Sequence, residues 1–340
     1  MTVADVDIEY DAAVVDAELL NRPHDVRVEG GRAYVAGKGG TFAVVDTGEM
    51  RVLGGLTCFD DAQVVCPVAP DCCYVGDAQG VFAVDVADPT DPTVVASIER
   101  PSLGLLNGWD RWGPYLVGAS KRGYIGVVDV ADPADPTFAG ERDTLATSDV
   151  PLSRDDRTDF EERDAAVVRS PHDVRVVGHR AVVPDQHPHA DRKLGVYELD
   201  AADGVVEATP IAFHEDARLR GANRVVVRDG VGYVAANYAD TVGVFADVAG
   251  DPTLRAAVAT AAPGPNGLAL SGDLLFVGAG ATVEAYDVSR DRYPELAASI
   301  TDREHLRTPG SAHDMDVAGD GLFVTAQPAD RLVRYEIRRG

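Results

Sequence analysis

A strand pattern that recurs along the chain is the feature of this 340-residue sequence that most restricts its fold. In each unit a polar residue opens a short apolar strand, a turn follows, a second strand ends in small residues, and a third apolar strand closes on Asp. The first unit runs from His24 through Arg32–Ala36 to Thr41–Asp46. We take the later units to start at comparable polar residues, which are Asp60, Asn107, His172, Asn223, Asn266 and His313. A repeat of this length indicates a fold built from one supersecondary unit.

The spacing of the units predicts an all-β propeller with seven blades. The starts lie 36, 47, 65, 51, 43 and 47 residues apart, and a four-stranded blade takes about 40–50 residues. The 65-residue interval contains a polar stretch at about residues 141–164, which we interpret as an insertion between blades. Apolar and β-branched residues recur at a period of two, whereas helical spacing is scarce. We therefore predict a single propeller domain over residues 1–340.

The N-terminal segment is predicted to complete the last blade. The last unit supplies only three strands, roughly Asp314–Val317, Leu322–Thr325 and Arg331–Ile337. Residues Tyr10–Asp16 are similar to outer-strand segments elsewhere in the chain, such as Pro92–Ile98. An N-terminal strand in this place would close the ring and remove an open sheet edge.

Several segments resemble known propeller families. Val84–Ala96 and Val127–Gly140 resemble the signature of LVIVD-repeat propellers, a family that is mostly without an assigned activity. Pro171–Val174, with Val183–Asp185, is similar to the seven-bladed lactonases related to 6-phosphogluconolactonase, and Pro265–Leu270 is similar to gluconolactonase-type propellers. These last two resemblances imply hydrolysis of sugar lactones. Because fold-level similarity alone does not decide an activity, both implications remain open.

The charge balance restricts the possible partners. The net charge is −25, and 28 of the 31 basic residues are arginine, since the only lysines are Lys38, Lys121 and Lys193. Such a chain is expected to bind neither nucleic acid nor a membrane, because phosphate groups would repel it. The acidic, lysine-poor composition is typical of proteins from a high-salt cytoplasm, where salt screens surface carboxylates. Neither a signal peptide nor a membrane-spanning run is predicted, so we expect a cytoplasmic protein.

The four cysteines lie close together in the sequence. They are Cys58, Cys66, Cys72 and Cys73, and they lack the two separated C-x-x-C pairs of a zinc ribbon. We favour reduced, half-buried thiols. A cross-strand disulfide from Cys66 to Cys72 or Cys73 is the alternative.

The first residues of the seven units are predicted to form a polar ring at the channel mouth, because the innermost strand of each blade lines the central channel. The ring would comprise His24, Asp60, Asn107, His172, Asn223, Asn266 and His313, all capable of binding a metal or a polar ligand. We assign the three asparagines to substrate binding. The alternative is structural, with these side chains bonded to neighbouring backbone and to ordered water.

A divalent metal of unknown identity is predicted at four of these positions. His24, Asp60, His172 and His313 would be its ligands, and the alternative is a calcium set of Asp60 with the three asparagines. His172, His24 and His313 are the candidate catalytic residues, one of them acting as general base towards metal-bound water or a metal-polarised carbonyl. Each is followed by Asp, which we expect to bond backbone between blades because neighbouring strand residues point to opposite faces. Neither a serine nucleophile nor a nucleotide cofactor is predicted.

The loops between the second and third strands should reach the same face. They contribute the remaining predicted substrate contacts, which are Lys38, Lys121, Asp185, His187, Tyr238 and Gln327. Together these features predict a small-molecule-binding propeller, with a metal-dependent lactone hydrolase as the leading function. The alternative is a non-catalytic LVIVD-like scaffold that binds a metabolite, or a protein through the 141–164 insertion.

Overall fold

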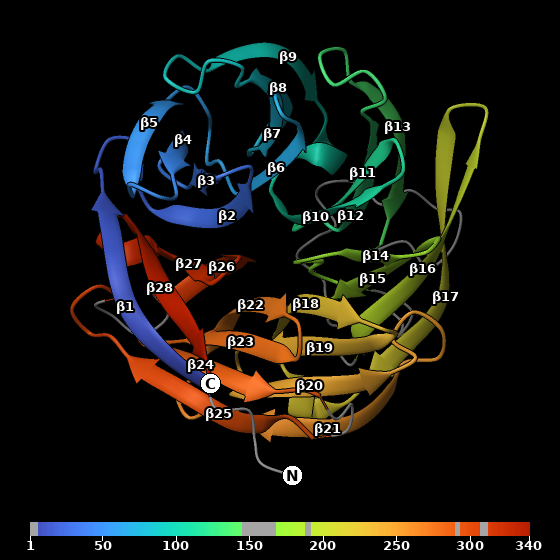
Figure 1. The fold of residues 1–340 in the computed structure, drawn as a ribbon. Coiled ribbons are helices and arrows are strands. Elements are labelled where there is room, and N and C mark those ends of the chain that lie inside the picture. Colours follow the sequence, from blue (N-terminus) through green and yellow to red (C-terminus); the bar gives the residue numbers. More distant parts are fainter. Residues whose placement is uncertain (1–5, 145–167, 188–191, 290–292, 307–311) are drawn as a thin grey trace.

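The computed structural model describes residues 6–144, 168–187, 192–289, 293–306 and 312–340. Within them, 28 strands form seven four-stranded antiparallel sheets arranged as blades in a ring (Figure 1). The predicted seven-bladed propeller is confirmed. In this described part of the chain no helix is long and apolar enough to cross a membrane.

Each blade uses four consecutive strands, except the last. Blade 1 comprises β2 (Pro23–Glu29), β3 (Arg32–Gly37), β4 (Thr41–Asp46) and β5 (Arg51–Leu56). Blade 2 comprises β6 (Val64–Ala69), β7 (Cys72–Gly76), β8 (Gly80–Asp85) and β9 (Thr93–Glu99). Blade 3 comprises β10 (Leu106–Trp112), β11 (Tyr115–Ser120), β12 (Tyr124–Asp129) and β13 (Thr137–Asp143). Blade 4 comprises β14 (Arg175–Val177), β15 (Arg180–Pro184), β16 (Arg192–Ala202) and β17 (Val205–Glu215). Blade 5 comprises β18 (Ala222–Arg228), β19 (Val231–Ala236), β20 (Thr241–Ala246) and β21 (Thr253–Ala259). Blade 6 comprises β22 (Pro265–Ser271), β23 (Leu274–Ala279), β24 (Thr282–Asp287) and β25 (Glu295–Thr301). Blade 7 comprises β26 (Ala312–Ala318), β27 (Gly321–Ala326), β28 (Arg331–Arg339) and β1 (Val6–Val15).

The N-terminal strand closes the ring, as predicted. β1 pairs antiparallel with β28 from Val6↔Arg339 to Val15↔Arg331, so blade 7 joins the two ends of the chain (Figure 1). The inner strand β26 contacts β2 of blade 1 across the closure. The N-terminal strand covers the edge of β28, which would otherwise be open to pairing with another chain.

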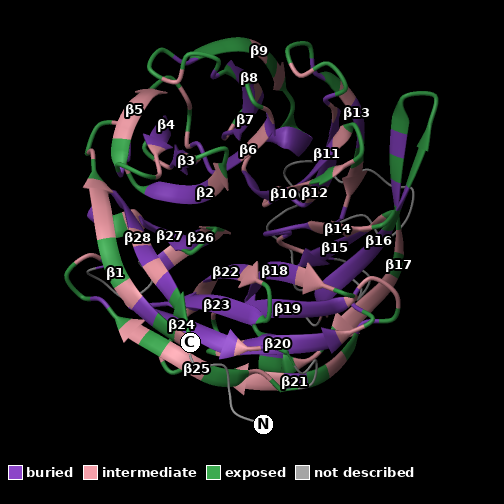
Figure 2. Ribbon diagram, in the orientation of Figure 1, coloured by how far each residue is buried: buried purple, intermediate pink, exposed green. Residues whose placement is uncertain are grey.

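The hydrophobic core lies between neighbouring blades. The inner and middle strands of the blades are mostly buried, whereas the outer strands, such as β9 and β25, contain many exposed residues (Figure 2). Between blades 1 and 2, for example, Tyr34 and Phe42 form one buried cluster with Val65 and Val75. Burial on both faces explains why second strands such as β3 and β7 are almost continuously apolar.

The closing strand is also held by an aromatic stack. The ring of Tyr10 in β1 lies 3.9 Å from the ring of His305, nearly parallel to it, and meets the edge of Tyr335 in β28. His305 Nδ1 lies 2.9 Å from Asp302, which also accepts a hydrogen bond from the Tyr335 hydroxyl at 2.9 Å. Tyr10 therefore ties β1 to both blade 7 and the segment that precedes it.

We predict that Tyr10→Ala weakens the closure. Loss of the stack and of the buried part of the ring is expected to cost about 1–2 kcal/mol. Hydrogen exchange should accelerate in β1 before any other strand, and the melting temperature should fall. Tyr293→Ala is the matched control, because Tyr293 is 66% exposed. Equal exchange rates in β1 of both variants would contradict this role.

Two further sequence predictions concern loops and thiols. Glu141–Asp143, the start of the predicted insertion, belong to strand β13. The remainder of the insertion, with any partner contact through it, lies outside the described residues. All four cysteines are free thiols, with Cys58 exposed and Cys72 and Cys73 buried, which agrees with the reduced state favoured above.

Candidate functional site

The start of each inner strand carries one residue at an equivalent place in the pairing register. In blade 1, Pro23 pairs with Gly37 and Asp25 with Ala36, so His24 is the extra residue of a β-bulge. Asn107, Asn223 and Asn266 occupy the same bulge in blades 3, 5 and 6. A bulge redirects the side chain of its extra residue, which brings these residues to a common position around the axis. We call these positions the axial ring.

The structure places six of the seven predicted residues in the axial ring and corrects the seventh. His172 follows the Pro171↔Asp185 bridge, and His313 lies between Ala312 and Met315 at the irregular start of β26. In blade 2, Val64 pairs with Gly76, so the residue equivalent to His24 is Gln63. The placement of Asp60 was wrong. Asp60 is exposed and accepts a hydrogen bond from Gln79 Nε2 at 2.9 Å.

A sequence signal for Gln63 exists. The ring residue always follows a proline, alanine or leucine and comes two residues before a buried apolar residue. Ala62-Gln63-Val64-Val65 fits this rule, and Asp60 does not. Polarity alone misplaced the position, because the loop before β6 contains several polar residues.

Each ring histidine donates a hydrogen bond to the next blade. Nδ1 of His24 lies 2.7 Å from the Gln63 carbonyl oxygen, and Nδ1 of His172 lies 2.9 Å from that of Asn223. Nδ1 of His313 lies 3.0 Å from the carbonyl oxygen of His24. In all three cases the acceptor is the ring residue of the following blade. Since a carbonyl only accepts, Nδ1 carries the proton and Nε2 is left as an acceptor.

The aspartate after each histidine forms a second link to the same neighbouring blade. Asp25 accepts from the Val65 amide at 2.8 Å, and Asp173 accepts from the Val225 amide at 3.0 Å. Asp314 is 3.4 Å from the Val26 amide nitrogen. The expectation that these aspartates bond backbone between blades is confirmed. At three of the blade junctions, a His–Asp pair therefore contacts the backbone of the following blade through both of its side chains.

Burial keeps the ring histidines neutral. Burial, together with the charges of His313 and Lys38, lowers the pKa of His24 well below its usual value. Burial, with Arg224 and Lys38, lowers the pKa of His313 to about 3. The pKa of His172 is also well below its usual value because of burial and the charge of Lys121. All three imidazoles are therefore neutral hydrogen-bond acceptors at pH 7.

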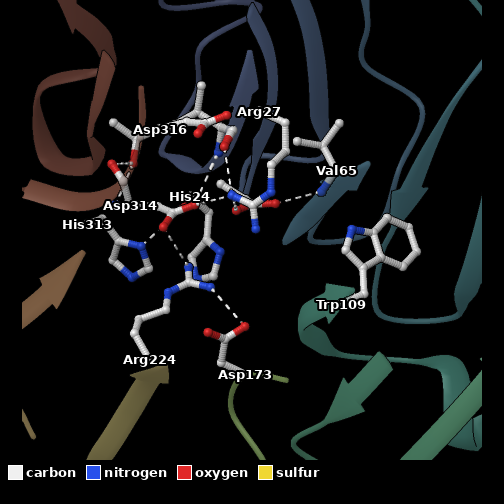
Figure 3. Close-up of polar contacts among 12 residues, drawn as sticks. His24, Arg27, Val65, Trp109, Asp173, Arg224, His313, Asp314 and Asp316 are labelled. Carbon is white, nitrogen blue, oxygen red and sulfur yellow. Dashed lines mark hydrogen bonds and ion pairs between the residues drawn. The ribbon is translucent and has the colours of Figure 1, made fainter. Parts of the chain in front are cut away.

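Arg224 contacts residues of three other blades near the axial ring, and Figure 3 shows its guanidinium close to Asp173, Asp314 and His24. From β18 its Nη1 donates to the Asn107 carbonyl oxygen at 3.1 Å, and the guanidinium approaches Asp173 at 3.8 Å and Asp314 at 3.5 Å. Only 3% of its side chain is exposed. Arg27 pairs with Asp25 at 3.1 Å and with Asp314 at 3.2 Å. Burial alone would raise the pKa of Asp314, but Arg224 and Arg27 help to hold it well below its usual range.

Two lysines lie at the turn that follows the second strand. Lys38 comes directly after Gly37, the partner of Pro23, and Lys121 directly after Ser120, the partner of Leu106. Both side chains are half-buried. Burial lowers the pKa of both, and for Lys121 the additional charges of Lys38 and Arg224 bring it to about 7. Within the described chain neither amine forms an ion pair or a side-chain hydrogen bond.

The other predicted contacts differ in their surroundings. Asp185 is fully buried, and its carboxylate accepts from the amides of Arg169, Ser170 and His187, so it organises its own loop. Burial raises the pKa of Asp185 to about 6. Tyr238 is 47% exposed. Gln327 follows Ala326, the partner of Ala312, and thus lies at the same turn position as Lys38.

Several buried polar atoms around the axis have no hydrogen-bond partner among the residues described. They are the acceptors His24 Nε2, Gln63 Oε1, Asn107 Oδ1 and Asn223 Oδ1, and the donor Gln327 Nε2. Buried polar groups are nearly always satisfied in folded proteins. The set therefore indicates space for ordered water or for a polar ligand.

The metal predicted at the three ring histidines and Asp60 stays a prediction. Across the described ranges no group of three or more His, Cys, Asp or Glu residues is placed to hold a metal ion. Without Asp60 the predicted set also lacks its carboxylate. Three cations, Lys38, Lys121 and Arg224, are among the groups that lower the pKa of His24.

The family comparison identifies the repeat in the first three blades. The LVIVD repeat model matches residues 23–47, 68–99 and 113–144. The chain contains LVIVD repeats. The matches cover β2–β4, β7–β9 and β11–β13. Of the axial ring, the LVIVD matches include only His24.

The comparisons beyond the LVIVD repeats bear on the fold only. The crystal structure of the computationally designed Ika8 protein is similar, with a TM-score of 0.61 and 10% sequence identity, over 95% of this chain and 98% of that chain. At this identity the similarity shows the fold alone. Among curated proteins none matches the chain.

A cavity of about 240 Å³ lies elsewhere, lined by Glu29, Gly30, Arg32, Tyr34, Ala69 and Pro70. These residues surround the β2–β3 and β6–β7 turns, at the opposite ends of the inner strands from the axial ring. The cavity is therefore separate from the candidate site.

Proposed function

We propose that this protein binds a small anionic molecule rich in hydroxyl groups at the axial ring. One observation carries the proposal. Two half-buried lysines, which form no ion pair in the described chain, lie beside a ring of hydrogen-bond acceptors that lack a donor. Three cations, Lys38, Lys121 and Arg224, act on this end of the axis in a protein of net charge −25.

The charge arrangement supports an acidic ligand. Lys38, Lys121 and Arg224 each lower the pKa of ring histidines, so the three cations act on the same small region. Arg224 is paired with Asp173 and Asp314, whereas neither lysine forms an ion pair among the described residues. Because charges interact more strongly where burial excludes water, a carboxylate or phosphate between the lysines would gain more here than at the surface.

The acceptors support hydroxyl groups on the same ligand. His24 Nε2, Gln63 Oε1 and Asn107 Oδ1 each need a donor. An anion alone would repel these atoms, whereas a hydroxylated acid supplies donors to them and its charge to the lysines. Polyhydroxylated carboxylates, such as sugar acids, combine both groups.

The test compares D-gluconate with D-sorbitol, which has the same carbon chain without the carboxylate. We expect gluconate to raise the melting temperature, with about 1.4 kcal/mol of stabilisation at ten times its dissociation constant. Sorbitol should have a much smaller effect. Calorimetric titration should show roughly tenfold weaker gluconate binding to Lys38→Gln. Arg218→Gln is the control, because Arg218 is exposed and paired with Asp216 at 2.6 Å.

A result in which gluconate and sorbitol act alike would contradict the proposal and leave water as the occupant of the ring. Metal-dependent lactone hydrolysis stays a prediction, since the comparisons give the lactonase resemblance no support. The LVIVD-like scaffold that binds a protein also stays a prediction.

A further inference from the structure

The distribution of lysine in this chain is unusual. Arginine supplies 28 basic residues and lysine only three. Two of the three lysines, Lys38 and Lys121, occupy equivalent turns beside the axial ring, and Lys193 is buried in β16. A guanidinium stays charged at any ordinary pH, whereas a buried amine can lose its proton. The two lysines beside the axial ring can therefore become neutral nucleophiles, whereas Arg224 cannot.

The surroundings of Lys121 favour the neutral amine. After burial, its strongest charged neighbours are two cations, Lys38 and Arg224, and the carboxylate of Asp61 acts more weakly. For Lys38 the order is different, because Asp61 is its strongest charged neighbour. The Lys121 amine is half-buried and forms no ion pair or side-chain hydrogen bond within the described chain, and its pKa is lowered to about 7, so the neutral form is accessible at neutral pH. The nearby imidazole of His172 is neutral as well.

We propose that Lys121 forms an imine with a small carbonyl compound bound at the axial ring. Nζ of the neutral amine attacks the carbonyl carbon, and the carbon–nitrogen double bond replaces the carbon–oxygen double bond. The two protons of the amine leave with the carbonyl oxygen as one molecule of water, so no oxidant or other reactant is needed. A lysine desolvated beside another cation is a known way to prepare this nucleophile.

The other amines serve as internal references. Lys193 lies beside Asp185, whose pKa its charge lowers. Lys38 shares the axial site but has Asp61 as its leading charged neighbour. We also expect 2-oxo acids to react in preference to neutral aldehydes. This expectation rests on the proposed function, since the same positive region would bind the carboxylate of a 2-oxo acid. Imine formation itself does not need that carboxylate.

The experiment uses the intact protein, sodium cyanoborohydride to reduce any imine, and two probes at pH 7, pyruvate and butanal. Peptide mass mapping then measures alkylation at each lysine, with the amino-terminal peptide scored separately because α-amines also react at this pH. We expect Lys121 to be alkylated at least tenfold faster than Lys38 and Lys193. Lys121→Arg should abolish the axial adduct, whereas Lys38→Arg should retain it.

The two probes separate this inference from the proposed function. Selective alkylation of Lys121 by butanal supports the imine whatever the affinity for anions. If pyruvate then has no advantage over butanal, and gluconate gives no protection, the imine stands and the anion proposal falls. If neither probe favours Lys121 tenfold in the wild-type protein, the inference is overturned, even where gluconate binds. Because this readout is made on the wild-type chain, it does not depend on the folding of a variant.

Discussion

Replacing Arg224 by methionine is expected to lower the free energy of unfolding by about 3–5 kcal/mol, because it removes one of the two arginines that lie beside each of two buried carboxylates. Asp173 and Asp314 are almost fully buried, and both lie within 4 Å of the Arg224 guanidinium. The donor to the Asn107 carbonyl is lost as well. Scanning calorimetry should show a melting temperature lower by roughly 5–10 °C. Arg218→Met, at an exposed pair, should change the stability by less than about 1 kcal/mol.

A double-mutant cycle isolates the pairing from the loss of packing. Asp173→Asn alone should destabilise the protein, since it weakens the bonds to the Val225 amide and to two arginines. In the Arg224→Met background the same change should cost at least about 1 kcal/mol less, because the carboxylate it removes has already lost one of its two arginine neighbours. Strict additivity of the two changes would show that Arg224 acts through packing alone.

Local sequence pattern was sufficient to predict the fold. Each blade repeats the same order of polar start, apolar strands and turns, so one correctly interpreted unit predicts the others. The closure was predictable for the same reason, because the three strands that end the chain left one place vacant and Tyr10–Asp16 resembles an outer strand. These inferences depend only on residues that are neighbours along the chain.

The candidate site was only partly predictable, because its contacts join distant segments. The ring positions follow from the start of each inner strand, which is local, and six of seven were placed correctly. Arg224 reaches the carbonyl of a residue 117 positions away and was not predicted. No period or motif marks it, since the other blades carry aspartate, glycine or valine at its position. Only the closed ring brings these side chains together.

The two ring nitrogens of His24 differ in their contacts. Nδ1 holds the following blade, whereas Nε2 of His24 is left without a partner in the described chain. Both interpretations of the polar ring made from the sequence, as a structural feature and as a binding site, therefore apply to the same residue. The asparagines at the equivalent positions of blades 3, 5 and 6 have no atom that corresponds to Nε2. Asparagine is therefore a suitable replacement for testing the role of a ring histidine.

The neutral histidines make stability depend on pH. A folded pKa below the unfolded value of about 6.5 means that, in acid, the unfolded chain binds protons that the folded chain does not. The folded state is therefore favoured above pH 6.5 and loses stability as the pH falls towards the folded pKa, about 3 for His313. Each such histidine contributes a slope of up to about 1.4 kcal/mol per pH unit. Burial raises the pKa values of Asp25 and Asp185, which oppose this trend.

We therefore predict that His172→Asn destabilises the protein at neutral pH and stabilises it at acidic pH. At pH 7.5 the variant should be about 1 kcal/mol less stable than the wild type, because it loses the bond to the Asn223 carbonyl. At pH 4.5 it should be more stable by about 1–2 kcal/mol, since the wild type alone has to keep the buried imidazole of His172 unprotonated. Asp25 and Asp185 are present in both proteins, so their contributions cancel in the comparison. His179→Asn is the control, because the His179 side chain is 60% exposed, and it should leave the pH dependence unchanged. Urea unfolding at both pH values measures the difference, and parallel pH profiles for His172→Asn and the wild type would disprove the role of the neutral imidazole.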